Sequence, residues 1–244
     1  YYMPGHVWHI THRCHQKEFF LKFTKDRKRW VQWLYEAKKR FGLSVLNYVV
    51  TSNHIHLLVK DRGRGEISAG MQLVAGRVAQ EYNLRKKRKG SFWEDRYHAT
   101  SVATDEHLLH CLLYIDFNMV RAGVVQHPGE WAEGGYAEVL STQQRYNVID
   151  RTALMELLGI DNYEQLRSER KHWVDDALKV GHGPFERDPC WTESLAVGSL
   201  DFVKGVQGTL GVRGTNRSIQ RDKMGCVLRE TETKYLVVSS SEEY

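Results

Sequence analysis

Two histidines separated by one residue, His54 and His56, begin an apolar stretch in the N-terminal half of the chain. Apolar and β-branched residues flank Thr51-Ser52-Asn53, and this pattern predicts two strands joined by a tight turn. Because side chains alternate between the faces of a strand, the two imidazoles share one face while Ile55 lies on the other. The pair is therefore either half of a divalent-metal site or a hydrogen-bonded polar pair with a structural role.

A polar stripe on a predicted helix, residues 105–122, offers the second half of such a site. At about 100° per residue, one narrow face carries His107, His110, Tyr114, Asn118 and Arg121. The other faces are apolar enough to pack on a sheet, so we expect the stripe to line a site.

The Asn118 amide oxygen could join the two histidines around a metal ion, which would place the Tyr114 hydroxyl beside it. Such an ion keeps open positions and can polarise a phosphate, and a tyrosine hydroxyl can attack phosphorus. The alternative is that Tyr114 belongs to the core or its rim. Asp116 projects away from the stripe, and we expect it to be structurally paired.

The elements that must position these residues follow from apolar periodicity. Helices are predicted at 25–41, ended by Gly42, at 67–87 and at 105–122, where Thr104 is the expected N-cap. The expected strands and strand-like segments are 6–14, 43–50, 54–59, 92–93 and 97–102. The order β-α-β-β-α-β-α predicts an α+β fold, an antiparallel sheet with packed helices in a ferredoxin-like arrangement.

The character of the chain changes after about residue 136. Helices are predicted at 152–158, 162–178 and 200–210, followed by a glycine- and arginine-rich stretch, 211–221, and a polar end expected to be disordered, 239–244. We therefore expect two parts. Residues 1–140 form the domain with the site, and residues 141–244 form an accessory, mainly helical C-terminal region with a basic tail.

Composition narrows the class of protein. The 244 residues are 41% hydrophobic, and no apolar run approaches the ~20 residues of a membrane span. The N-terminus has no signal-peptide features, and four scattered cysteines (Cys14, Cys111, Cys190, Cys226) predict reduced thiols in a cytoplasmic protein. A net charge of +5 and the basic run 85–89 favour a polyanionic partner. The run is alternatively a solvated helix end.

Around His54, His56, Tyr114 and Asn118, the sequence resembles the single-tyrosine HUH transposases, and most closely the REP-associated tyrosine transposases of bacteria. The matching segments lie within roughly residues 1–140 and are 4–11, 47–59, 92–98 and 114–123. Residues 188–199 resemble the C-terminal extension of some members. Two positions depart from the family pattern: Met119 replaces a proline, and Thr51-Ser52 replaces the commoner Met-Pro. Because neither carries a ligand, we expect them to alter a turn and a helix end only.

The resemblance implies the HUH nuclease fold, Tyr114 as nucleophile, and His54, His56 and Asn118 as ligands of Mg²⁺ or Mn²⁺. The implied reaction is cleavage of single-stranded DNA at a REP-type palindromic hairpin, leaving a 5′-phosphotyrosine and a free 3′-OH, followed by rejoining. We then expect a bacterial, nucleoid-associated protein, and a monomer rather than a domain-swapped dimer.

DNA contacts are predicted at basic and aromatic side chains that could bind phosphates or stack on bases: Arg85, Lys86, Lys87, Arg88, Lys89, Trp93, Arg96, Tyr97 and Arg121. Trp8 is a further stacking candidate. His9, His12 and His15 are interpreted as ordinary strand and loop histidines, with DNA contact or an effect on the site as the alternative. Two other functions remain open. One is a non-catalytic protein that keeps the fold and binds hairpins or single-stranded DNA. The other is a metal-dependent hydrolase in which Tyr114 is structural.

Overall fold

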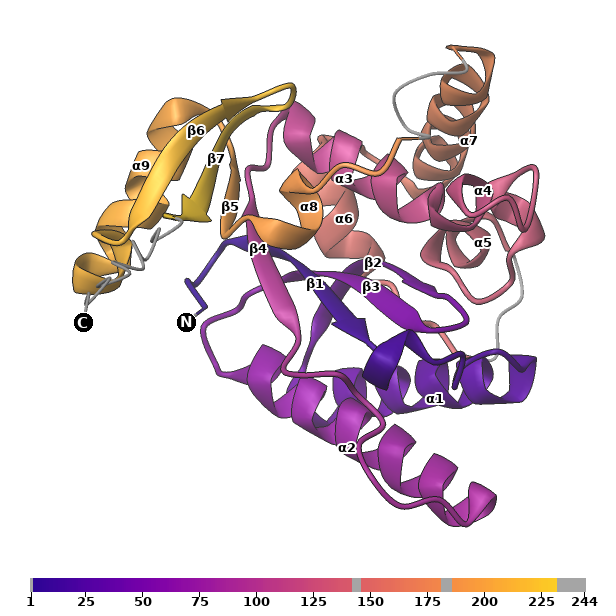
Figure 1. Ribbon diagram of the computed structural model, residues 1–244. Coiled ribbons are helices and arrows are strands. Elements are labelled where there is room, and N and C mark those ends of the chain that lie inside the picture. The colour runs from indigo at the N-terminus through magenta and orange to yellow at the C-terminus, as the bar shows by residue number, and fades with distance from the viewer. Residues whose placement is uncertain (1, 142–145, 181–185, 232–244) are drawn as a thin grey trace, which may run out of the picture.

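A mixed sheet forms the centre of the molecule in the computed structural model, which describes residues 2–141, 146–180 and 186–231 (Figure 1). The strand order is β2-β3-β1-β4-β5-β7-β6. The strands are β1 (Val7–Arg13), β2 (Ser44–Val50), β3 (His54–Lys60), β4 (His98–Val102), β5 (Ala196–Gly198), β6 (Arg217–Asp222) and β7 (Gly225–Glu230). The disorder expected for 239–244, and the tail beyond residue 231, fall outside the described ranges.

The first four strands confirm the ferredoxin-like prediction. β1 pairs antiparallel with both β3 and β4, and β2 pairs antiparallel with β3. Helices α1 (Thr24–Phe41) and α2 (Glu66–Lys86) pack side by side on one face of this sheet, and α3 (Glu106–Asp116) contacts β2, β3 and β4 from the other (Figure 1). α1 buries Trp30, Leu34 and Ala37 at helical spacing and ends at Gly42, whose φ of 72° is left-handed.

The helix predicted at 105–122 is divided in the structure. Phe117, at φ −77° and ψ 2°, separates α3 from the short helix α4 (Asn118–Arg121). The N-cap is Asp105, because its carboxylate accepts from the His107 backbone N–H, and not Thr104 as predicted. The strand-like segment 92–93 was also overpredicted, since Trp93 forms only an isolated bridge with Cys14.

Helix α5 (Gly135–Leu140) ends the first of the two predicted parts. The C-terminal region contains helices α6 (Arg151–Leu158), α7 (Tyr163–Val180), α8 (Cys190–Glu193) and α9 (Leu200–Thr209). It also supplies three strands that the sequence reasoning missed. β5 pairs parallel with β4, and the hairpin β6–β7 pairs with β5, so this region continues the same sheet. The glycine- and arginine-rich stretch 211–221 contains most of β6.

A buried ion pair ties α7 to α3. Arg170 Nη2 lies 2.5 Å from Asp116 Oδ2, and both side chains are 1% exposed. Asn47 Nδ2 donates to the other oxygen of Asp116 at 2.9 Å. Asp116 is thus structurally paired, as predicted. In the described parts of the chain, every helix is too short or too polar to cross a membrane.

Candidate active site

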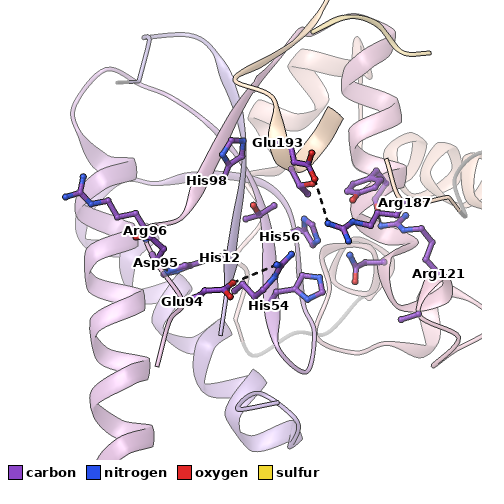
Figure 2. Close-up of a pocket in the computed structure, with 16 residues that line it drawn as sticks. His12, His54, His56, Glu94, Asp95, Arg96, His98, Arg121, Arg187 and Glu193 are labelled. Carbon is purple, nitrogen blue, oxygen red and sulfur yellow. Dashed lines mark hydrogen bonds and ion pairs between the residues drawn. The ribbon is translucent and has the colours of Figure 1, made fainter. Parts of the chain in front are cut away.

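A cavity of about 550 Å³ opens where β1 and β3 meet the junction of α3 and α4 (Figure 2). The predicted nucleophile and the three predicted metal ligands all line it. The remaining wall comes from β1, the segment before β4, and the C-terminal region. The lining residues are Thr11, His12, Arg13, His54, His56, Glu94, Asp95, Arg96, His98, Tyr114, Asn118, Arg121, Ala122, Arg187, Thr192 and Glu193.

His54 is held as a neutral imidazole with a defined tautomer. Its Nδ1 lies 2.8 Å from Asn53 Oδ1, which can only accept, so Nδ1 carries the proton. Thr51 Oγ1 lies 3.0 Å from the same nitrogen. Burial, with smaller contributions from the charges of Arg13 and Arg121, lowers the pKa of His54 to about 4. The lone pair therefore resides on Nε2, the nitrogen suited to bind a metal.

His56 is held by a second histidine beneath it. His56 Nδ1 lies 2.9 Å from Nε2 of His9, and the two rings stack with centroids 5.0 Å apart. His9 is fully buried, and burial lowers its pKa to about 3 and that of His56 well below the ordinary value. His56 can bind a metal through Nε2 when its Nδ1 donates to His9.

The outer nitrogen of His9, Nδ1, faces the C-terminal region. It has no partner of good hydrogen-bond geometry within the described residues. The backbone of Trp191 nevertheless acts on His9 as a hydrogen-bond acceptor that raises its pKa against the effect of burial. The Trp191 ring also faces His9 edge-on at 6.5 Å. The C-terminal region therefore encloses the inner side of the histidine pair.

Tyr114 lies between these histidines and Arg121. Its side chain is 6% exposed, and its ring stands perpendicular to His56 with centroids 5.7 Å apart. The Arg121 guanidinium lies 4.1 Å above the ring and donates to the Tyr114 carbonyl oxygen at 2.7 Å. Burial raises the pKa of Tyr114, while Arg121 and Arg187 oppose that rise. The resting side chain is a neutral phenol beside two positive charges.

The donor set fits a small divalent cation. His54 and His56 present neutral imidazoles, and Asn118, one turn after Tyr114, lines the same cavity and has an amide oxygen that could join them. Elsewhere in the described residues, no three His, Cys, Asp or Glu side chains gather as a metal site. These three residues are therefore the metal-binding candidates that the described chain offers.

The predicted polar stripe does not lie wholly in this cavity. Tyr114, Asn118 and Arg121 line it, but His107 Nε2 is 2.5 Å from the Met224 carbonyl oxygen, and His110 lines a separate apolar cavity. The turn between β6 and β7 contacts His107 through Met224, and Met224 also lines the second cavity with His110.

The predicted DNA contacts are divided between two places. Arg96 and Arg121 line the cavity, whereas residues 85–89 form the exposed end of α2 and its following turn and are not among its lining. Trp93 stacks on His12 at 4.1 Å and donates to the Ala75 carbonyl oxygen, so one of its faces is covered.

Tyr97, the other aromatic DNA contact predicted, is half-buried and stands edge-on to His12 at 6.1 Å. Trp8 is 5% exposed. Its burial in the core excludes the base-stacking role considered for it.

Several cavity residues were not found from the sequence. Arg13 lies opposite His54 in the β1–β3 register and is 3.8 Å from Glu94, while Arg187 is 4.0 Å from Glu193 (Figure 2). Alternation along β1 could have placed Arg13 on the face of His9. Arg187 comes from an irregular segment with no sequence pattern to mark it.

Comparisons with known proteins find one matching family model. Residues 3–118 match the family model described as IS200-like transposase. The chain matches none of the curated proteins.

Two solved structures are similar to parts of the chain. One is a REP-associated tyrosine transposase bound to a REP hairpin, with 17% identity and a TM-score of 0.49, covering 62% of this chain and 91% of that one. The other is a protein of Deinococcus radiodurans R1 described as a transposase, with 14% identity and a TM-score of 0.35, covering 51% and 89%.

Proposed function

We propose that this chain, which is of the IS200-like transposase family over residues 3–118, cleaves and rejoins single-stranded DNA through Tyr114. The observation that carries the proposal is the meeting of Tyr114 with two neutral, hydrogen-bonded histidines and Asn118 in one cavity. A protein that only bound DNA would need none of these four side chains in this arrangement.

His54, His56 and Asn118 would hold Mg²⁺ or Mn²⁺. The bound cation would polarise the scissile phosphate and stabilise the charge that develops on it. The three ligands carry no charge of their own, so they leave the cation's full positive charge available to the phosphate. Arg13, Arg96, Arg121 and Arg187 line the same cavity, and their cations favour entry of the DNA backbone.

The proposed reaction exchanges one phosphodiester for another. The Tyr114 oxygen attacks phosphorus as its phenolic proton leaves, and the bond from phosphorus to the 3′-oxygen breaks. The 3′-oxygen takes up a proton and departs as a 3′-OH, while the 5′ phosphate stays on Tyr114. A 3′-OH then attacks the phosphotyrosine, which rejoins the strand and restores the phenol. The positive charges of Arg121 and Arg187 lower the cost of forming the phenolate.

The proposed substrate is a REP-type palindromic hairpin with single-stranded flanks, in a bacterial cytoplasm, acted on by a monomer. Support comes from the family of residues 3–118 and from the resemblance of the Tyr114 and His54 segments to REP-associated enzymes.

A denaturing gel separates this proposal from its alternatives. The protein is incubated with an end-labelled single-stranded hairpin and Mn²⁺, and a covalent protein–DNA adduct is expected with wild type and with Tyr97→Phe but not with Tyr114→Phe. Cleavage without an adduct would indicate a hydrolase that uses water. A gel shift without cleavage would indicate a non-catalytic hairpin-binding protein.

A further inference from the structure

We propose that Phe19 and Phe23, at the entry to α1, form a stacking platform on which unpaired bases of single-stranded DNA lie. The inference rests on the proposed function, because it names the surface that holds the strand outside the cavity. Neither residue was among the predicted DNA contacts.

The two phenyl rings are unusually open to solvent. Phe19 is 62% exposed and Phe23 is 53% exposed, although both lie in a short segment that packs against the domain. Phe20, between them, shows the contrast, because its ring packs against Tyr82 and Phe92 at 5.3 and 5.2 Å. Phe20 anchors the segment and leaves its two neighbours in water, where a flat apolar partner would cover them.

The platform is surrounded by positive charge from two elements. Lys86 Nζ lies 5.7 Å from the centre of the Phe23 ring, and the Arg88 guanidinium lies 4.4 Å from that of Phe20. The end of α2 therefore lies beside the start of α1. Other exposed side chains of these segments are Lys17, Glu18, Lys22, Lys25, Arg85, Lys87 and Lys89. Rings interleaved with cations are the combination by which proteins bind single strands without reading sequence.

The same segment is tied to the turn that carries the candidate metal site. The Leu21 N–H donates to the Ser52 carbonyl oxygen at 2.9 Å, and Asn53 Nδ2 donates to the Lys17 carbonyl oxygen at 3.1 Å. Asn53 also fixes the His54 ring. The platform and the cavity are thus linked through one turn, so a strand held in the cavity has this surface next to its path.

The positive charge around Phe19 and Phe23 favours single-stranded DNA over a second copy of the chain as the partner of this surface. A second copy of the chain seated on the same face would bring two sets of lysines together, which disfavours self-association. Of the two carboxylates in this segment, Glu18 is exposed among several lysines, and Asp26 is buried and paired with Arg85. A polyanion with flat apolar groups satisfies both the lysines and the rings, and single-stranded DNA has this chemistry.

Fluorescence anisotropy of a labelled oligothymidylate of about 20 nucleotides, longer than one typical binding site, tests the proposal. The measurement is made with EDTA, so it stands whether or not Tyr114 cleaves DNA. Phe19→Ala and Phe23→Ala are each expected to weaken binding about tenfold, within the range for loss of base stacking. Phe41→Ala is the matched control, because Phe41 is also exposed on α1, about 27 Å along the helix from Phe23.

Two further variants test the nature of the contact. The double change Phe19→Tyr with Phe23→Tyr keeps two flat rings and is expected to keep the affinity. The double change to Leu keeps apolar area without a flat face and is expected to lose most of it. Equal affinities for wild type and the Ala variants would overturn the proposal. So would Ala variants that lose binding only to vesicles of phosphatidylcholine and phosphatidylserine, which would make the patch a membrane contact.

Discussion

His9 Nε2 lies 2.9 Å from His56 Nδ1, and this bond between two buried side chains of neighbouring strands makes His9 the support of a proposed metal ligand. A histidine that binds metal through one nitrogen is oriented by the partner of the other. His9 also contacts the Tyr114 ring edge-on at 6.0 Å, so one buried side chain touches both halves of the proposed site.

The first prediction concerns this support. His9→Phe keeps an aromatic ring and removes the hydrogen bond, so we expect Mn²⁺ affinity to fall about 10- to 100-fold. Isothermal titration calorimetry measures it, and His110→Phe is the control because His110 lies on α3 away from this cavity. An unchanged affinity in a folded His9→Phe protein would show that His56 needs no such support.

Substitution of the proposed metal ligands should affect DNA cleavage more than DNA binding. His54→Ala or His56→Ala is expected to abolish hairpin cleavage while sparing much of the hairpin affinity, because the metal stabilises the transition state more than the ground state. Cleavage is followed on a gel and affinity by anisotropy with EDTA. Parallel loss of both would place the histidines in binding and not in catalysis.

The free energy of unfolding should fall as the pH is lowered, and His12 should account for a measurable part of that fall. Burial lowers the pKa of His12 from 6.5 to about 4, so between these values the unfolded chain binds a proton that the native state does not. The free energy of unfolding therefore falls as pH drops through this window and is intact above about 6.5. His12→Gln is expected to reduce the slope by about 1 kcal/mol per pH unit near pH 5.5. Urea titrations at several pH values check it, and equal slopes would contradict it.

The Asp116–Arg170 pair should contribute to the free energy of unfolding and not to DNA cleavage. Asp116→Asn leaves the Arg170 charge buried without its partner, and we expect a loss of about 3–5 kcal/mol in unfolding free energy. The double change Asp116→Leu with Arg170→Met removes both charges and is expected to recover most of it. A folded Asp116→Asn protein with wild-type stability but no cleavage would instead give Asp116 a part in the reaction.

Arg187 should contribute to DNA binding through charge. We expect Arg187→Gln to weaken hairpin binding and to reduce the slope of log affinity against log salt by about 0.7, the value for one phosphate of a single strand. Arg64→Gln, an exposed arginine between β3 and α2, is the control. An unchanged slope would place Arg187 outside the DNA path.

Local patterns predicted the elements around the candidate metal site. The β2–β3 hairpin and α1 have clear periodicity and end at a polar turn and at Gly42, so their bounds agree with the structure within a residue or two. β5 has three residues and β6 exposes polar side chains, so neither has an alternation long enough to indicate a strand. Their pairing depends on β4 and on each other, which are long-range contacts.

The site residues also divide into those predicted by local patterns and those brought together by long-range contacts. His54 and His56 lie on β3, and Tyr114 and Asn118 lie one turn apart on either side of the α3–α4 break, so strand and helix geometry predicts which side chains share a face. His9 faces His56 across strands, and Arg187 and Trp191 arrive from the C-terminal region. Those neighbours follow from tertiary packing, which one sequence does not reveal.

The parallel pairing of β5 with β4 has a consequence for biosynthesis. His54, Tyr114 and Asn118 leave the ribosome well before Trp191 encloses His9 and before β5 covers the open edge of β4. Translation thus produces the residues of the proposed site first and the segments that enclose them last. We expect the proposed site to be completed only after Trp191 and β5 have been synthesised and have packed against His9 and β4.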